Sequence, residues 1–204
     1  MKDAKKAQRH VEITQAAYRL LAEKGYSGTS MLSIARASKA SNETLYRWYG
    51  DKVGLFASMV RDNARETCSM LESAITEGED PKAALEGVAP VLLSMLLGER
   101  AISLNRAAAS DASAELGAVI AQEGREKVRP LVISVLEELS AQSGVEPSIA
   151  SEWFFGLLIG DRQIRRVIGV MPQPSTLEIE EICRDAQAAF FRLLDQGAAS
   201  SAAR

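Results

Sequence analysis

Apolar residues recur with the period of an α-helix along nearly the whole chain, and almost nowhere do they alternate as in a β-strand. The pattern is plainest near the C-terminus, where the capping box Ser175-Thr176-Leu177-Glu178 precedes a long apolar stripe. That stripe comprises Ile179, Ile182, Ala186, Ala189, Phe190 and Leu193. Because hydrophobic residues make up 47% of the 204-residue chain, it can bury a substantial core. We predict an all-α protein of about nine helices.

The first 60 residues contain a long helical pattern followed by two short ones. The long pattern covers residues 4–24 and stops at Gly25, in the position where glycine ends helices. The candidate N-caps are Thr29 or Ser30 for the second helix and Ser41 or Asn42 for the third. Two short helices separated by a few residues and packed on a longer one form a helix-turn-helix, whose second short helix enters the major groove of DNA.

The third helix carries more aromatic and basic side chains than a buried helix needs. If Leu45 and Tyr49 face the core, the rotation of about 100° per residue turns other side chains outward. Arg47 suits guanine or phosphate, whereas Trp48 and Tyr49 suit a small core because their rings supply so much buried area. The outward candidates are Asn42, Thr44, Tyr46 and Arg47.

Charge is divided unevenly along the chain. Residues 1–60 hold ten Lys or Arg against five Asp or Glu, whereas the remainder holds fourteen against twenty-two. A basic head on an acidic protein suggests a polyanionic partner for the head alone. Uneven surface charge without a partner is the alternative.

A specific run of residues joins these features. It reads Gly25-Tyr26, Thr29-Ser30, Ile34-Ala35, Leu45-Tyr46, Trp48-Tyr49, Lys52 and Leu55. With this spacing the first 60 residues resemble the DNA-binding head of the TetR family of transcriptional regulators. The stretch "SKASNETL" departs from the family's usual glycine or valine in the turn, and Tyr49 replaces the commoner phenylalanine. Both departures leave the base preference open.

The resemblance implies roles for individual residues. Side chains at the places of Thr29, Tyr46 and Lys52 meet phosphates in the family, while the start of the third helix reads bases. Lys39 in the turn would flank the same groove. The full set of predicted DNA-binding residues is Thr29, Ser30, Lys39, Ser41, Asn42, Thr44, Tyr46, Arg47, Tyr49 and Lys52.

The rest of the chain is expected to bind a ligand and to dimerise. We predict a DNA-binding domain over residues 1–60, a ligand-binding and dimerisation domain over 61–196, and a disordered tail over 197–204. Predicted helices cover 81–98, 101–109, 112–143 with an interruption near Gly124 or Pro130, 147–169, and 175–194. The pattern of residues 104–132 and 156–169 also resembles the regulatory domains of the AefR-like branch of the family.

The last two helices are predicted to form a four-helix interface with a second copy of the chain, as in the family. A core within a single chain is the alternative. Trp153 and Phe154 fit either this interface or a ligand pocket. The predicted dimerisation residues are Trp153, Phe154, Leu157, Ile179, Ile182, Ala186 and Phe190.

A ligand pocket is predicted on the middle helices, where apolar residues mix with a few polar groups. Asn105 and Arg106 fit this pocket or, alternatively, an exposed helix surface. The candidate ligand-binding residues are Met95, Leu96, Asn105, Arg106, Leu116 and Ile120.

Several classes of site find little support in the sequence. No phosphate-binding glycine loop, nucleophile elbow or clustered metal-ligand set is apparent, so we expect neither an enzyme nor a cofactor or metal. His10 sits in a charged segment and is predicted to be solvated. Cys68 and Cys183 suit small buried residues in a reducing cytosol. The longest apolar run, residues 87–98, is too short for a bilayer, and with no export signal apparent we expect a cytoplasmic protein without a membrane partner.

These features predict a homodimeric, ligand-responsive regulator of transcription, a repressor that binds a palindromic DNA operator and is released by a small apolar or amphipathic effector. The alternative is a DNA-binding regulator or an architectural or adaptor protein that senses no small molecule.

Overall fold

The predicted all-α architecture is confirmed by the computed structural model, which describes residues 2–202 and the side-chain surroundings of residues 4–197. Three of its helical segments have six residues or fewer, and without them nine helices remain in the described part of the chain. The segments are α1 (Lys2–Lys24), α2 (Met31–Ala37), α3 (Asn42–Tyr49), α4 (Lys52–Glu77), α5 (Pro81–Leu97), α6 (Glu99–Ala109), α7 (Glu115–Ile120), the π-helical η1 (Ala121–Arg125), α8 (Glu126–Ser143), α9 (Pro147–Ile159), α10 (Arg162–Val167) and α11 (Thr176–Ala202).

The chain divides into two compact units. Unit 1 contains Met1–Asn63 together with Ser103–Gly124, and unit 2 contains Ala64–Ile102 together with Arg125–Arg204. Unit 1 thus holds the predicted head and, in addition, most of α6, all of α7 and part of η1. Helix α4 begins in unit 1 and continues without a break into unit 2.

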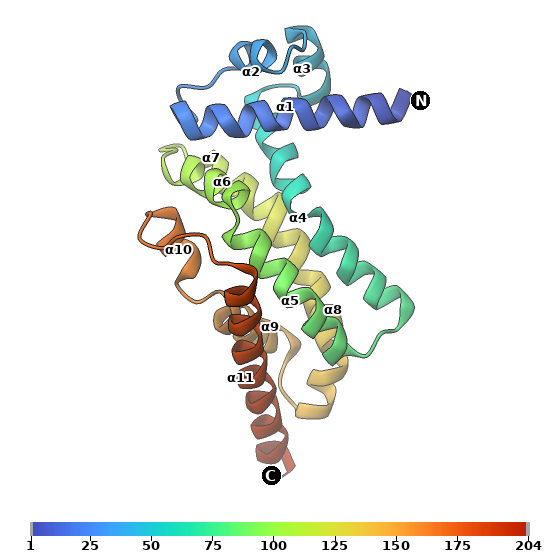
Figure 1. Ribbon diagram of the computed structural model, residues 1–204. Helices are drawn as coiled ribbons and strands as arrows, with labels where there is room; N and C mark the ends of the chain where they lie inside the picture. Colours follow the sequence, from blue (N-terminus) through green and yellow to red (C-terminus); the bar gives the residue numbers. More distant parts are fainter. Residues whose placement is uncertain (1, 203–204) are drawn as a thin grey trace. The chain divides into compact units, whose positions relative to one another are not determined.

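Unit 1 is built around a small apolar core. Helix α2 packs against α1 and α3, and Figure 1 shows both short helices on the same side of α1. Ile13, Ile34 and Leu45, from α1, α2 and α3, are at most 2% exposed in this core. Leu104 and Leu116, from α6 and α7, belong to the same cluster. The sequence pattern did not predict this contribution, because it comes from a segment far away in the chain.

Local chemistry fixes the short helices of unit 1. The hydroxyl of Ser30 accepts the Ser33 N–H and the hydroxyl of Ser33 accepts the Ser30 N–H, which together cap α2. Ser41 caps α3 by accepting the Thr44 N–H at 3.1 Å. Ser30 and Ser41 are therefore the N-caps among the predicted alternatives. At the other end of α3, Gly50 has φ 79°, a conformation that glycine adopts without strain.

Unit 2 is a bundle in which α5, α8, α9 and α11 pack on one another, with α9 and α11 side by side (Figure 1). Phe154 of α9 and Phe190 of α11 meet edge to face at its centre, with ring centroids 5.6 Å apart. The predicted capping box begins α11: Ser175 accepts the Glu178 N–H, and the Glu178 carboxylate accepts the Ser175 N–H.

Two boundaries differ from the prediction, and one predicted alternative is resolved. The predicted helix over residues 147–169 is broken after Ile159, because Gly160 adopts φ 52° and α10 starts anew. The predicted interruption near Gly124 is a π-helical turn, whereas Pro130 lies inside α8. The predicted disordered tail is instead helical through Ala202, since alanine favours helix, and residues 203 and 204 lie outside the described residues.

A buried arginine holds the break between α5 and α6. Arg166 of α10 is 5% exposed, and its guanidinium donates to the carbonyl oxygens of Leu97 at 3.0 Å and Met171 at 3.3 Å. It also pairs with the Glu99 carboxylate at 2.5 Å. The carbonyl of Leu97 is one of the last in α5 and lacks a partner within its own helix, so Arg166 caps α5 and fixes α10 against it.

Of the helices described here, none alone is long and apolar enough to cross a membrane, although the bent pair α5 and α6 passes the same test together.

Candidate nucleic-acid interface

Helix α3 separates a buried side from an exposed one. Leu45 is fully buried, whereas Asn42, Tyr46 and Arg47 are exposed, Tyr46 to 50%. The guanidinium of Arg47 lies 3.9 Å from the carboxylate of Glu43, one turn earlier, and both side chains remain largely in solvent. Such an exposed pair contributes little to stability, so Arg47 can exchange its partner at small cost. This face offers an amide, a phenol and a guanidinium, which are the groups that bind base edges and phosphates.

The turn between α2 and α3 has an unusual backbone. Lys39 is exposed and adopts φ 54°, in the left-handed region that glycine adopts most readily. The guanidinium of Arg9, from α1, donates to the carbonyl oxygens of Ser38 at 3.2 Å and Lys39 at 3.5 Å. The turn is thereby fixed to α1, and Lys39 stands in it three residues before α3 begins.

Two of the predicted phosphate-binding side chains point inward instead. Thr29 is 3% exposed, and its hydroxyl is directed at the carbonyl oxygens of Leu20 and Gly25. Lys52 donates from Nζ to the carbonyl oxygens of Tyr26 and Thr29, each at 3.0 Å. Their first role in this structure is to hold the loop between α1 and α2, because unpaired buried carbonyls at a helix end are costly.

Hydroxyl groups complete the N-terminal ends of the two short helices. Ser30 and Ser41 are exposed, and the Ser41 hydroxyl lies 2.8 Å from that of Thr44, which is half-buried. Both serines remain accessible beside backbone N–H groups of a first helical turn. Such positions suit a phosphate.

Tyr49, another predicted DNA-binding residue, takes part in a hydrogen-bond network of side chains. Its hydroxyl lies 2.8 Å from Nδ1 of His10, and Nε2 of His10 contacts the Asp62 carboxylate. Burial raises the pKa of Tyr49 to about 12. His10 was predicted to be solvated, and this expectation is wrong: the ring is partly buried among α1, α3 and α4. Its partners lie 39 and 52 positions away, beyond the reach of local sequence patterns.

The predicted ligand-binding residues are divided between the two units. Met95 and Leu96 pack against the core of unit 2, whereas Leu116 and Ile120 pack in unit 1. Asn105 is half-buried and Arg106 is exposed, which agrees with the alternative of a helix-surface position for Arg106.

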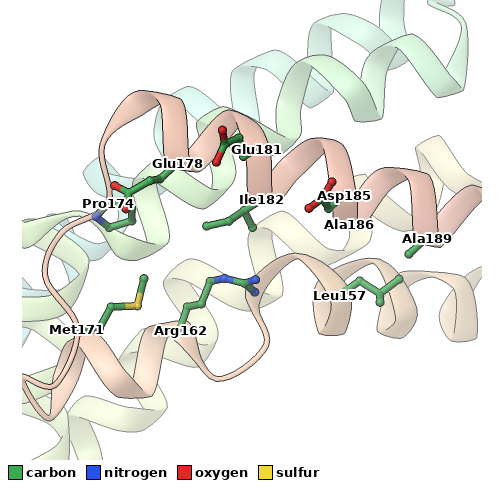
Figure 2. A pocket seen from close by; sticks show the side chains of 10 residues that line it. All are labelled: Leu157, Arg162, Met171, Pro174, Glu178, Glu181, Ile182, Asp185, Ala186 and Ala189. Carbon is green, nitrogen blue, oxygen red and sulfur yellow. The ribbon is translucent and has the colours of Figure 1, made fainter.

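Unit 2 does contain a groove, with a volume of about 470 Å³. Figure 2 shows carboxylates of α11 along one side, and Arg162, Met171 and Leu157 opposite them. Of the predicted dimerisation residues, Leu157, Ile182 and Ala186 line this groove. The other four lie in or against the core of unit 2, and they are Trp153, Phe154, Ile179 and Phe190. The groove lining is Leu157, Arg162, Met171, Pro174, Glu178, Glu181, Ile182, Asp185, Ala186 and Ala189.

The described residues contain no group of three or more His, Cys, Asp or Glu side chains arranged to hold a metal ion. The fold of unit 1 and the exposed face of α3 instead define a helix-turn-helix DNA-binding protein. Residues 13–59 match the model for bacterial regulatory proteins of the tetR family, and residues 83–193, more than half of the chain, match that for the C-terminal domain of AefR-like transcriptional repressors. The chain belongs to the TetR family of transcriptional regulators.

Individual proteins are also similar to this chain, one in sequence and two in structure. The chain is 31% identical over 85 residues to YuxN, an uncharacterized HTH-type transcriptional regulator of Bacillus subtilis (strain 168), a match that covers 42% of this chain and 29% of YuxN. A crystal structure from Mesorhizobium loti MAFF303099, assigned to TetR-family transcriptional regulators, superimposes with a TM-score of 0.72 at 27% identity, covering 92% of this chain and 96% of that one. A TetR transcriptional regulator from Agrobacterium tumefaciens gives 0.67 at 26% identity, with 90% and 92% covered.

Proposed function

We propose that this protein is a cytoplasmic, homodimeric repressor that binds a two-fold symmetric DNA operator and is released by a small apolar or amphipathic effector. The observation that supports DNA binding is the exposure of Asn42, Tyr46 and Arg47 on α3, opposite the buried Leu45. In this proposal α3 enters the major groove, Arg47 and Asn42 contact base edges, and Tyr46 contacts a phosphate.

Phosphate contacts from residues that precede α3 would fix its register. Lys39 is exposed in the turn before α3, and Ser30 is exposed at the N-terminus of α2. The excess of Lys and Arg in residues 1–60 supports the same assignment, since neutralised phosphates supply most of the salt-dependent affinity for DNA.

A second copy of the chain is the proposed occupant of the groove in unit 2. Nearby in the sequence, Ile164, Ile168, Val170 and Leu177 are 56% to 72% exposed, an unusual density of large apolar side chains in solvent. The groove has an acidic edge on α11, with Glu181 and Asp185, and a basic residue, Arg162, opposite. In a two-fold symmetric interface the same surface patch of each subunit contacts that of the other in the opposite orientation. The acidic edge of one groove can therefore face the Arg162 of the other.

Release by an effector requires that the effector bind the form that does not hold DNA more tightly than the form that does. The match of residues 83–193 to AefR-like repressors supports a regulatory role for this part of the chain. A regulator that senses no small molecule is the second candidate. A thermal-shift screen distinguishes the two, because an effector that binds only the folded state raises the melting midpoint.

The decisive experiment is the selection of bound duplexes from a randomised DNA pool at a stated salt concentration, with the wild-type protein and Tyr46→Ala compared. Enrichment of a two-fold symmetric site by the wild-type protein, reduced in the variant, is the expected result. If a folded wild-type protein enriches no sequence, operator recognition is excluded.

Sedimentation equilibrium tests the dimer separately. Leu157→Arg places a charge in the groove and should shift the protein toward monomer, whereas Met70→Arg, at a partly exposed apolar residue of α4, should not. A wild-type protein that remains monomeric at micromolar concentration would contradict the proposed interface.

A further inference from the structure

His10 is the single histidine of the chain, and both of its ring nitrogens are engaged by side chains from other helices. From α1 its Nδ1 lies 2.8 Å from the hydroxyl of Tyr49, the last residue of α3. Its Nε2 contacts the carboxylate of Asp62, ten residues into α4. The rings of His10 and Tyr49 are also in contact, with centroids 5.9 Å apart. A single side chain therefore joins three helices of unit 1.

The chemistry of the three groups keeps both contacts in either protonation state of the imidazole. When the ring is neutral, Nε2–H donates to Asp62 and Nδ1 accepts the Tyr49 O–H. When the ring is protonated, Nε2–H and Nδ1–H both donate, and the Tyr49 oxygen becomes the acceptor. A phenol can both donate and accept, so the hydrogen bond between His10 and Tyr49 persists in both protonation states. A side chain that could only donate or only accept would lose it in one of them. A phenylalanine at position 49 would leave Nδ1 without this partner.

We propose that His10 is a positioning residue for DNA recognition: it sets the orientation of α3 relative to α1 and α4, and thereby the placement of Asn42, Tyr46 and Arg47. The inference rests on the proposed function of α3. Leu45 anchors the middle of the helix in the core, and the hydroxyl of Tyr49 anchors its C-terminal end. Rotation about Leu45 is then opposed by Tyr49, which holds the exposed face in one register.

The same contact gives α4 a direct connection to α3. Asp62 lies on α4, which continues as one helix to Glu77 in unit 2. His10 therefore links the N-terminal part of α4 to the C-terminal end of α3. Loss of His10 should therefore affect sequence discrimination more than overall folding.

The test uses the full chain and the DNA sequence enriched by the wild-type protein. Dissociation constants are measured for that operator and for a scrambled duplex, at a temperature well below the melting midpoint of each protein. The proteins compared are the wild type, Tyr49→Phe, His10→Leu and the double variant. Gln8→Ala is the matched control, because Gln8 is exposed on the same helix and, among the residues that the structure describes, bonds to Glu12 one turn further along. Thermal melts establish that each variant is folded.

We expect each single substitution to lower the ratio of operator affinity to scrambled-duplex affinity about fivefold, the scale of one lost hydrogen bond. The double variant should lose no more than the larger single effect, since the contact that Tyr49→Phe removes is one that His10→Leu also removes. Gln8→Ala should leave the ratio unchanged.

Folded variants with an unaltered ratio, or losses that add in the double variant, would overturn the positioning role. If the wild-type protein itself does not distinguish the two duplexes, the proposed function fails instead. These two failures are distinguished by the wild-type ratio alone.

Discussion

The ammonium of Lys52 lies 3.9 Å from the centroid of the Tyr26 ring and donates a hydrogen bond to the carbonyl oxygen of the same residue at 3.0 Å. It also donates to Thr29, so one side chain from the start of α4 holds the loop before α2 at two carbonyls and one ring. Burial lowers the pKa of Lys52, as expected for an ammonium drawn against the protein surface. Lys52 therefore has a structural role in the loop before α2, in addition to its predicted contact with DNA.

Replacing Lys52 by methionine keeps the aliphatic chain but removes both hydrogen bonds and the cation. We expect the free energy of unfolding to fall by about 1 kcal/mol. Lys5→Met, at an exposed lysine of α1, serves as the control and should have no measurable effect. Denaturant titration measures both. Equal stability of the two variants would show that the contacts of Lys52 are not stabilising.

The left-handed backbone of Lys39 gives a prediction in which strain and charge are separable. Lys39→Gly relieves the backbone strain, whereas Lys39→Ala keeps it, and both remove the same charge. The glycine variant should be more stable than the alanine variant by about 1 kcal/mol in thermal melts. Both should reduce the salt dependence of DNA binding by about one phosphate contact. A reduction in only one variant would contradict a phosphate contact by the ammonium.

Arg47 and Glu43 test which exposed side chain of α3 reads the DNA. Arg47→Ala should weaken operator binding by about 1–3 kcal/mol and relax the preference at one base pair. Glu43→Ala removes the neighbouring carboxylate and should leave affinity unchanged or increased, because it frees Arg47 and reduces repulsion of phosphate. Competition binding against single-base variants of the operator measures the preference. An Arg47→Ala protein with unaltered affinity and preference would exclude this placement of α3.

These residues also indicate how far the sequence determines the site. Helix periodicity and capping residues predicted α1, α2, α3 and the start of α11, because those signals are local: the Ser30 and Ser41 caps act within three residues. The exposed side of α3 followed from the same periodicity, since burying Leu45 turns Tyr46 and Arg47 outward.

The inward roles of Thr29, Lys52 and His10 were not predictable in this way. Each depends on a partner brought near by the tertiary fold: Lys52 bonds to carbonyls 23 and 26 positions away, and His10 to side chains 39 and 52 positions away. A family motif records that such residues recur, but not whether they face DNA or the protein. The same applies to Leu116, predicted for a ligand pocket and found in the core of unit 1.

Two tyrosines make unit 1 sensitive to high pH. Burial raises the pKa of Tyr49 from 10.0 to about 12, and burial together with the charges of Glu115, Asp111 and Asp51 does the same for Tyr26. Because the folded state favours the protonated phenol, this stability is fully present below pH 10.0 and is lost as pH rises through about 12. Tyr49→Phe should reduce this loss. Denaturant titrations over that pH range measure it, and an identical slope in both proteins would refute the contribution of Tyr49.

Arg166 should be the most sensitive arginine in unit 2. Arg166→Met leaves the Leu97 carbonyl without its partner, and we expect a loss of about 2 kcal/mol in the free energy of unfolding. Arg166→Lys should not restore it, because a single ammonium cannot reach carbonyls and carboxylate in three directions. The neighbouring Arg165→Met, which breaks only an exposed pair with Asp161, is the control. Comparable melting temperatures for Arg165→Met and Arg166→Met would rule out the capping role.

The core that unit 1 shares with α6 and α7 limits how this regulator can be recombined with others. A chimera that joins residues 1–63 to a foreign regulatory domain would expose the apolar surfaces that Leu104, Ala107 and Leu116 now cover. The smallest DNA-binding unit that can be transferred therefore consists of two separate stretches of chain. A chimera should contain residues 103–124 together with the helix-turn-helix.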